Sequence, residues 1–349
     1  MTIEPANSQN VQKTSIFSRL RLTAKLPAVM ILLALIPCIT LGISIYNYAV
    51  EEMKRVAHTQ VELAATTRSA RISSYLQGLE TQMRNLSYNP TVQDASLKLT
   101  NGFHQVSDKP ARTLRRAYIK RNPFGAGERE RLVRADGGSD YDAAHGGFHE
   151  WARRFRSENG LHDLYLMDTR GNVVYSVRKD DDFASNMRDG RLLNTELGRA
   201  YRAAMDNGLS GISAFGDFAP YHPADGSVSG FLAAPVVKDG ERIGVVAFRI
   251  SLRAITRVVS SPIGLGDTGE AMMFNAAGQM LSDSRFSLRD DIRTSEKDAP
   301  DVVRAARGEA GVVEMTDQQG KAVISAFAPL DFLGYHWSFV VRLSEGEVL

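Results

Sequence analysis

The stretch DLYLMDTRGNVVYSV, residues 163–177, runs from apolar residues through a short polar centre with a glycine and back to apolar residues. This pattern predicts two β-strands joined by a tight turn. The stretch EAMMFNAAGQMLSDS, residues 270–284, repeats it, with Gly278 in the place of Gly171. Since any single hairpin has such a pattern, only the surrounding segments can show whether a larger unit is repeated.

The segments after the two hairpins correspond in the same order. Residues 195–208 and 298–311 both have helical spacing. The strand-like runs FLAAPVV…IGVVAFRI (231–250) and SAFAPL…WSFVVRL (325–343) then resemble each other. Two correspondences in one order favour an internal repeat over coincidence.

Within these runs Pro235 is equivalent to Pro329, and Arg249 matches Arg342. Each repeat thus consists of a hairpin, a helix and three further strands. This order suits an antiparallel sheet with helices on one face. We therefore predict an α+β fold with two tandem modules of this kind.

A charge-free run, LPAVMILLALIPCITLGISIY, occupies residues 26–46. As a helix it would be roughly 32 Å long, which matches the hydrocarbon core of a bilayer. We predict a transmembrane helix over residues 26–48. A cleaved signal peptide is the alternative, but the run is longer than the usual apolar region of such a peptide and no A-x-A site follows it.

Basic residues flank this run unequally. Residues 1–25 carry four lysines and arginines close to the run, whereas Lys54 and Arg55 follow it. Because short cytoplasmic segments are enriched in lysine and arginine, we expect residues 1–25 to be a cytoplasmic tail and the rest to lie outside the membrane.

Residues 49–98 begin with a long run of good helix formers, which predicts a stalk helix. A stripe of apolar residues recurs along it at spacings of four and three. We expect a homodimer through this stalk helix, although the stripe would equally suit packing against the chain's own modules. The stripe consists of Ile72, Leu76, Leu79, Met83 and Leu86.

The chain has 349 residues and a formal net charge of +2, which gives no argument for a nucleic-acid partner. Its single cysteine, Cys38, lies in the apolar run, so no intrachain disulfide can form. The sequence contains no G-x-S-x-G, no Walker phosphate loop and no H-E-x-x-H. We therefore expect no enzyme and no cofactor.

His145 and His149 are four residues apart and would share one face of a helix. Gly146 and Gly147 between them weaken a helix, and no third ligand is evident. We expect a capping or packing role for the two histidines and no metal site.

Longer phrases resemble the sensory half of bacterial methyl-accepting chemotaxis proteins with a double Cache domain. These phrases are YDAAHGGFHEWARRF (141–155), DFAPYHPADGSVSGFLAAPVV (217–237), GLGDTGEAMMF (264–274), LSDSRF (281–286) and SAFAPLDFLGYHWSFVV (325–341), together with the first hairpin. They occur in the order of that family, and the resemblance extends over roughly residues 15–345.

The resemblance implies two PAS-like modules. One is membrane-distal with a helical insert, residues 99–258, and one is membrane-proximal, residues 259–345. It also implies that a small molecule binds in the distal module, that the protein lies in the bacterial plasma membrane, and that the modules are periplasmic. The expected function is a chemotaxis sensor in signal transduction.

The chain ends at RLSEGEVL, where receptors of this family continue into a second membrane helix and a cytoplasmic signalling domain. We expect a sensor without its output, as a fragment, a truncated gene product or a protein that acts through a partner. The sensor half of a histidine kinase or of a nucleotide cyclase is an alternative. A purely structural or partner-binding anchor is another.

The phrase FGDFAPYHP places Asp217, Tyr221 and His222 between strands, where small molecules commonly bind. A solvated loop shaped by prolines would have the same composition. Tyr165 and Tyr175 alternate with apolar residues in the first hairpin, so each faces either a cavity or the core.

Arg249 is a charge within a strongly apolar strand, and a buried charge needs a partner. That partner is either a ligand or Asp217 within the fold. In the amino-acid-binding members of the resembled family an aspartate occupies the matching place. We therefore expect a ligand other than an amino acid, and an anion if Arg249 faces the pocket, because a guanidinium binds two oxygens at once.

Overall fold

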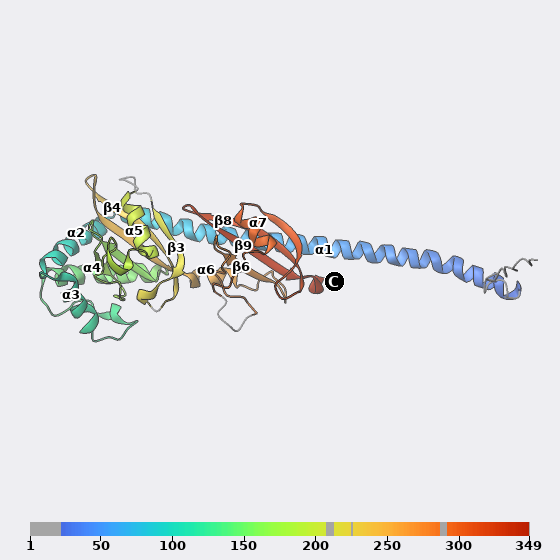
Figure 1. Ribbon diagram of the computed structural model, residues 1–349, viewed down its shortest axis with the longest axis horizontal. Helices are drawn as coiled ribbons and strands as arrows, with labels where there is room; N and C mark the ends of the chain where they lie inside the picture. Colours follow the sequence, from blue (N-terminus) through green and yellow to red (C-terminus); the bar gives the residue numbers. More distant parts are fainter. Residues whose placement is uncertain (1–21, 207–212, 225, 287–291, 349) are drawn as a thin grey trace, which may run out of the picture. The chain divides into compact units, whose positions relative to one another are not determined.

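Helix α1, Leu22–Ser87, begins the described part of the chain (Figure 1). The described residues divide into two units, one of residues 22–56 with 348 and one within 57–347, and α1 contributes to both. The predicted tail, residues 1–25, lies almost wholly outside the described residues, as does the Asn-Gly end of the helix predicted over 195–208. The computed structural model describes residues 22–206, 213–224, 226–286 and 292–348.

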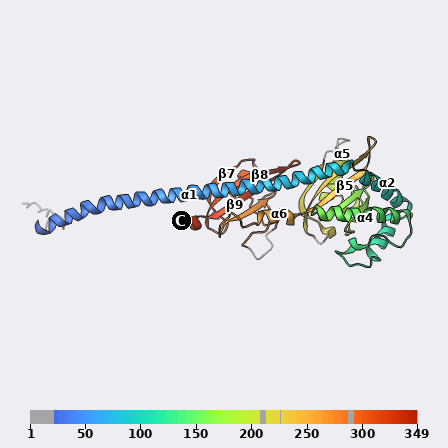
Figure 2. The same ribbon diagram turned by 180° about the vertical axis from the view of Figure 1, so that it is seen from behind.

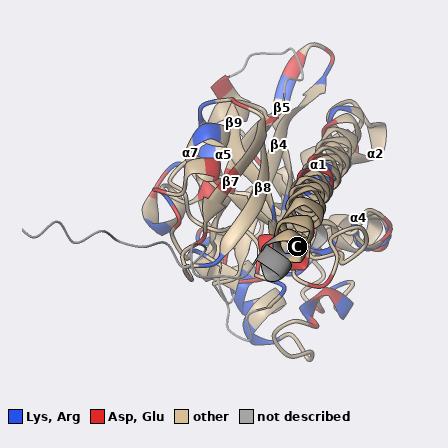
Figure 3. Cartoon of the chain, turned by 90° about the vertical axis from the view of Figure 1, so that its right-hand side faces the viewer, with Lys and Arg blue, Asp and Glu red and all other residues tan. Residues whose placement is uncertain are grey.

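The first part of α1 is continuous through Pro27 and Pro37. Its large apolar side chains are exposed from Leu26 to Tyr48. Among the described helices, α1 is the one with the length and apolar composition needed to cross a membrane. In Figure 3 the near part of α1 is mainly tan, in keeping with the absence of charge.

The second part of α1 buries the predicted stripe against its own chain. The five stripe residues are all buried, and the buried face extends back to Ala57. Arg68 donates hydrogen bonds to the carbonyls of Ser261 and Ile263. Ser87, at the end of the helix, donates to the carbonyl of Pro235. The stripe therefore packs against the chain's own modules, which α1 runs alongside (Figure 2).

Helix α2, Pro90–Gln105, starts where Asn89 caps it, with the side-chain oxygen of Asn89 accepting from the backbone N–H groups of Thr91 and Val92. Because Pro90 lacks an N–H and disfavours the helical conformation for the residue before it, α1 ends here. Ser139 and Asp142 form a capping box for the third long helix. The helices between α2 and the first sheet are α3, Pro110–Arg115, a π-helical turn, Arg116–Lys120, a 3-10 turn, Arg129–Arg131, and α4, Asp140–Glu158.

The first sheet is antiparallel, with five strands in the order β2-β1-β5-β4-β3. Helix α5 packs on one face, where Leu197 belongs to the same buried cluster as Tyr165. The other face is also covered, since Phe155 of α4 contacts Phe248 of β5. The sequence predicted helices on one face of the sheet only, whereas the structure has helices on both faces. This arrangement explains why the strands are buried throughout. Its elements are β1, Asp163–Met167, β2, Val173–Ser176, α5, Glu196–Asp206, β3, Ala214–Pro220, β4, Val228–Lys238, β5, Glu241–Ser251, and the 3-10 turns Gly190–Leu192 and His222–Ala224.

The second sheet is antiparallel, with four strands in the order β6-β9-β8-β7. Its second hairpin strand is reduced to an isolated bridge between Phe274 and Met280. Helix α7 covers one face and contacts β8 and β9. The elements are α6, Leu252–Val259, β6, Glu270–Phe274, α7, Pro300–Ala306, β7, Gly311–Thr316, β8, Ala322–Phe332, β9, Tyr335–Ser344, and α8, Glu345–Val348.

The two hairpin turns are built alike. The Oδ1 atom of Asp168 accepts from the backbone N–H groups two and four residues later, and Oδ1 of Asn275 does the same. Gly171 and Gly278 donate their N–H groups to the carbonyls of these residues and have positive φ angles of 90° and 70°. The predicted α+β fold with two antiparallel modules is confirmed, whereas the exact limits 99–258 and 259–345 stay predictions.

Candidate ligand site in the first module

Two arginines occupy matching positions in the two sheets. Arg249 of β5 lies directly opposite Asp163 of β1, and Arg342 of β9 lies directly opposite Glu270 of β6. In each module the first strand therefore supplies an acid beside the arginine of the last strand. The sequence match between Arg249 and Arg342 thus reflects equivalent positions in the fold.

Arg249 is fully buried, and its guanidinium is held by side chains of the same module. Its Nε donates to Ser229 Oγ at 2.9 Å, and its Nη2 donates to Ser227 Oγ at 2.9 Å. Its Nη1 lies 3.5 Å from Asp180 Oδ2, and the guanidinium carbon lies 5.1 Å from the centre of the Tyr221 ring. The internal carboxylate partner is therefore Asp180, so the alternative in which Asp217 takes this role is wrong.

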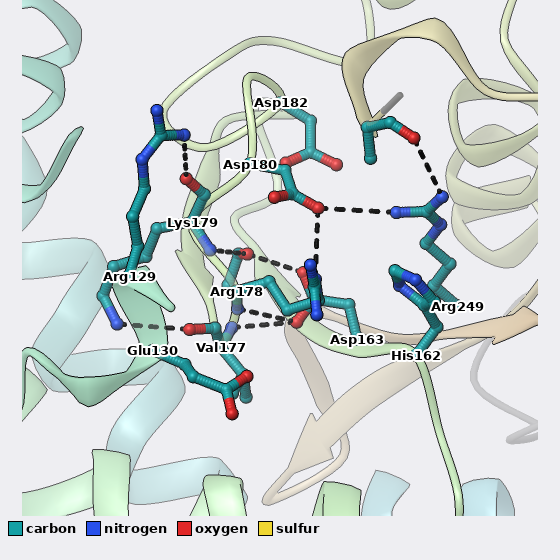
Figure 4. A network of polar contacts seen from close by, with 12 residues as sticks. Arg129, Glu130, His162, Asp163, Val177, Arg178, Lys179, Asp180, Asp182 and Arg249 are labelled. Atoms are coloured by element: carbon teal, nitrogen blue, oxygen red, sulfur yellow. Dashed lines mark hydrogen bonds and ion pairs between the residues drawn. The ribbon is translucent and has the colours of Figure 1, made fainter. Parts of the chain in front are cut away.

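Asp182 lies beside Asp180, on the segment that follows β2 (Figure 4). The hydroxyls of Tyr165 and Tyr221 both donate to its Oδ2, at 2.9 and 2.8 Å. Its Oδ1 is buried and has no hydrogen-bond partner among the described residues. Because a buried polar atom without a partner costs free energy, this oxygen is a natural hydrogen-bonding contact for a bound solute.

Burial raises the pKa of Asp182 to about 7, and the nearby charges of Asp163 and Asp180 act in the same direction. Asp163 is also fully buried, and burial followed by the charge of Asp180 raises its pKa to about 6. Asp163 and Asp182 are therefore buried carboxyls that compete for negative charge in one small volume, with Arg249 as a buried cation nearby. We call Asp163, Tyr165, Asp180, Asp182, Tyr221 and Arg249 the Arg249 cluster.

Asp163 fixes the segment that carries the other two aspartates. Its Oδ1 accepts from the backbone N–H groups of Val177 and Arg178, and its Oδ2 accepts from Ser176 Oγ at 2.8 Å (Figure 4). The side chain of Arg178 lies 3.4 Å from Asp180. Hydrogen bonds to Asp163 of the first strand thus position the chain after the hairpin, which carries Asp180 and Asp182.

Lys179 lies beside this cluster, fully buried, with a positive φ of 54°. Its Nζ lies 3.2 Å from the carbonyl of Val177 and 3.2 Å from His149 Nε2, and His149 Nε2 is also 2.7 Å from the carbonyl of Glu130. A neutral amine suits this place, because it donates to Val177 and accepts the N–H that His149 shares with Glu130. Burial lowers the pKa of Lys179 to about 7, which agrees with that arrangement.

The remaining predicted residues lie outside the Arg249 cluster. The hydroxyl of Tyr175 is 2.6 Å from His149 Nδ1, on the side of helix α4. Asp217 accepts from the indole N–H of Trp337 at 2.9 Å, and His222 is exposed on a short 3-10 turn. His145 Nδ1 lies 2.7 Å from the carbonyl of Val133, which fits the predicted packing role of the two histidines.

Of the six candidates, Tyr165, Tyr221 and Arg249 come together, whereas Tyr175, Asp217 and His222 do not. The cluster residues that the sequence did not predict are Asp163, Asp180 and Asp182. The signal for the last two was the run KDDD, residues 179–182, directly after the first hairpin. A run of charges usually marks a solvated loop, but here Asp182 is fully buried.

A comparison with curated proteins found no significant match. Among solved structures, the fold is similar to that of methyl-accepting chemotaxis protein X, with a TM-score of 0.51 and 14% identity over 84% of this chain and 99% of that one. The ligand-binding domain of the Pseudomonas fluorescens chemoreceptor CtaA in complex with L-isoleucine gives a TM-score of 0.47 at 17% identity, over 86% of this chain and 96% of that one. The extracellular domain of the proposed histidine kinase mmHK1S-Z2 gives 0.47 at 16% identity, over 85% and 98%.

Because these identities are low, the similarity to methyl-accepting chemotaxis protein X shows a shared fold and does not show a shared ligand or role. The family comparison is more extensive. A protein-family model described as a Cache domain matches residues 44–349 of the sequence. These residues include both sheets and the second part of α1. The chain therefore belongs to the Cache-domain family of ligand-binding sensor modules.

Proposed function

We propose that this chain is the extracytoplasmic sensor of a bacterial chemotaxis receptor, anchored by α1, and that it binds a small solute at the Arg249 cluster. Family membership and the apolar length of α1 support a membrane-anchored sensor. The basic residues before the apolar run support a cytoplasmic N-terminus with the two modules in the periplasm.

The observation that carries the proposal is the unpartnered Oδ1 of Asp182. The surrounding groups are all paired, since Arg249 is held by two serines and Asp180, and both tyrosine hydroxyls are held by Asp182. A solute that hydrogen-bonds to this oxygen would satisfy a buried polar atom that the described protein leaves unpaired. The sequence predicted an anionic solute if Arg249 faces the pocket. Because Arg249 already has an anionic partner in Asp180, the structure gives this prediction little support.

Signalling follows from contacts between the modules and α1. Arg68 and Ser87 of α1 bind backbone carbonyls at residues 261, 263 and 235. We propose that the solute binds two arrangements of the first module with different affinity and so favours one position of α1. In a homodimer through the stalk helix, the contact would use the face that carries Leu63, which is 65% exposed, because the buried stripe is already covered.

The test is a thermal-shift screen of the purified full chain in detergent against solutes of matched size that are amines, carboxylates or neutral alcohols. At a concentration 100 times its Kd, a solute that binds only the folded state stabilises it by about 2.7 kcal/mol. We expect at least one class to give a rise in Tm that Asp182→Asn abolishes. Asp189→Asn is the matched control, because Asp189 is exposed.

No Tm rise with any class would contradict solute sensing and favour a structural or partner-binding anchor. If no class gives a rise that Asp182→Asn abolishes, the solute site lies elsewhere in the chain. The type of receptor is tested separately by the reading frame after codon 349. A second membrane helix followed by a methylated coiled coil would identify a chemotaxis receptor, whereas a kinase or cyclase domain would identify one of the two alternatives.

A further inference from the structure

The second module contains a cavity of about 700 Å³ on the face of its sheet that α7 covers. Its apolar lining comes from Met272 of β6, Met280, Phe286 and Val323 of β8. Its polar lining includes Glu270, Glu296 and Arg342. This volume lies within the range of roughly 300–1,000 Å³ that is typical of small-molecule sites. The cavity is distinct from the Arg249 cluster, and neither site shares a residue with the other.

The cavity occupies the place in the second module that the Arg249 cluster occupies in the first. Strand register pairs Glu270 with Arg342 as it pairs Asp163 with Arg249. Two residues along β6, Met272 stands where β1 has Tyr165. A position that is filled by a buried tyrosine and its carboxylate partner in one module is therefore an open chamber in the other.

The arginine of this cavity is already compensated. Its Nε and Nη2 bind Asp301 of α7 at 2.7 and 3.0 Å, and its Nη1 lies 2.7 Å from Glu296 Oε2. Burial lowers the pKa of Arg342, but the bonds to Asp301 and then Glu296 outweigh it and raise the pKa above its ordinary value. One permanent cation thus meets two carboxylates at the floor of the cavity, which leaves no open guanidinium edge for an anion.

The rest of the lining adds negative charge. Four carboxylates line the cavity, Asp267, Glu270, Glu296 and Asp317, against two cations, Lys321 and Arg342. Asp301, fully buried behind Arg342, is a fifth carboxylate nearby. A concave site with an excess of one sign of charge concentrates ligands of the opposite sign.

We propose that the second module binds a small organic cation, an alkyl amine, in this cavity. Its ammonium group donates to the carboxylates of Glu270 and Glu296, and its carbon chain lies over the side chains of Met272, Met280 and Val323. The chain would then hold two sites of different chemistry, one in each module. This inference does not depend on a solute at the Arg249 cluster.

The experiment is calorimetric titration of the full chain in detergent with three four-carbon probes at an ionic strength of ~0.15 M, where long-range attraction is screened. The probes are 1,4-diaminobutane, 1,4-butanediol and succinate, which share a length and differ in charge. We expect binding of the diamine at least tenfold tighter than that of the diol, and no binding of succinate. Equal affinity for the diol, or a preference for succinate, would overturn the proposal.

Two variants locate the diamine. Glu270→Gln removes one lining charge, and Met272→Trp fills the chamber without changing its charge; each should weaken diamine binding at least tenfold. Glu309→Gln, on an exposed ion pair with Arg304 away from the cavity, is the matched control and should bind as the parent chain does. Asp182→Asn should also leave diamine binding unchanged. Circular dichroism would first show that Met272→Trp is folded. Diamine binding that is undiminished in this variant would overturn the site. Loss of diamine binding in Asp182→Asn alone would overturn it as well.

Discussion

Trp337 of β9 donates its indole N–H to Asp217 of β3 at 2.9 Å, and this bond joins the second sheet to the edge strand of the first. Aromatic contacts surround it, since the ring of Trp337 lies 5.8 Å from that of Phe215 and 5.6 Å from that of Phe218. The strand that carries Arg342 is therefore tied directly to the first module. Asp217, predicted as a ligand contact, also serves the contact between the sheets.

Replacing Trp337 by Phe should destabilise the chain by about 1–3 kcal/mol, because it leaves the Asp217 carboxylate without its donor in a largely buried place. Thermal unfolding of the two chains would measure the difference. Trp151→Phe is the matched control, since Trp151 is half-buried and stacks on Phe155 with rings 5.4 Å apart. An equal loss in both variants would show that the hydrogen bond adds nothing.

The stripe of α1 should matter for folding, and the opposite face should not. Leu76→Ala removes a fully buried side chain and should cost about 2–5 kcal/mol through lost burial and a residual cavity. Leu63→Ala, at a site 65% exposed, should cost less than ~0.5 kcal/mol. Chemical unfolding monitored by circular dichroism measures both. The reverse order would show that the stripe is not packed on the chain's own modules.

The turn at Gly278 should tolerate alanine less well than a similar turn at Gly320. Both glycines have positive φ, 70° and 81°, so alanine strains each by about 1–2 kcal/mol. A Cβ at Gly278 would also lie 2.4 Å from the Cα of Lys297, whereas a Cβ at Gly320 meets nothing within 4 Å. We expect Gly278→Ala to lower the Tm clearly more than Gly320→Ala. Equal shifts would contradict the close approach of these two segments.

The buried carboxyl of Asp182 predicts that the folded chain loses stability as the pH rises from acidic toward neutral values. The pKa of Asp182 is raised from 3.8 to about 7 on folding, so the folded state binds more protons than the unfolded state between these values. Stability contributed by this group is therefore lost as pH rises from about 4 to about 7, by on the order of 2–4 kcal/mol. The stability of Asp182→Asn relative to the parent chain should rise over this range, as measured by Tm against pH. A constant difference would contradict the buried, protonated carboxyl.

The buried Lys179 predicts that the folded chain gains stability as the pH rises above neutral, which is opposite in sign to the effect of Asp182. Its pKa is lowered from 10.5 to about 7, so the unfolded state binds more protons between these values, and stability rises as pH increases through the range. Lys179→Met should remove this rise, so the parent chain gains stability relative to the variant between pH 7 and 10. Parallel curves for the two chains would show that Lys179 stays charged in the fold.

The sequence predicted the fold well because its repeat is local. Glycine in the same place of two hairpins, and arginine near the end of two last strands, reflect turn geometry and strand register that short stretches determine. Helices on the second face of the first sheet could not be predicted in this way. Their placement depends on contacts such as Phe155 with Phe248, which lie far apart along the chain.

The site was predicted less completely for the same reason. Tyr165, Tyr221 and Arg249 are conspicuous as polar groups in apolar surroundings, and they do meet. Asp182 looked like one of several charges in a loop, because its burial depends on the fold of the segment that Asp163 holds in place. Charge runs that follow directly on a buried hairpin therefore merit the same attention as charges within a strand.

Hydrogen exchange of the full chain with and without the solute that stabilises it tests the central claim most directly. If the solute binds at the Arg249 cluster, protection should concentrate in peptides that contain residues 177–183 and 221–224, and Asp182→Asn should remove it. Protection confined to residues 270–344, or no change in the first module at a saturating concentration of solute, would contradict a ligand site there.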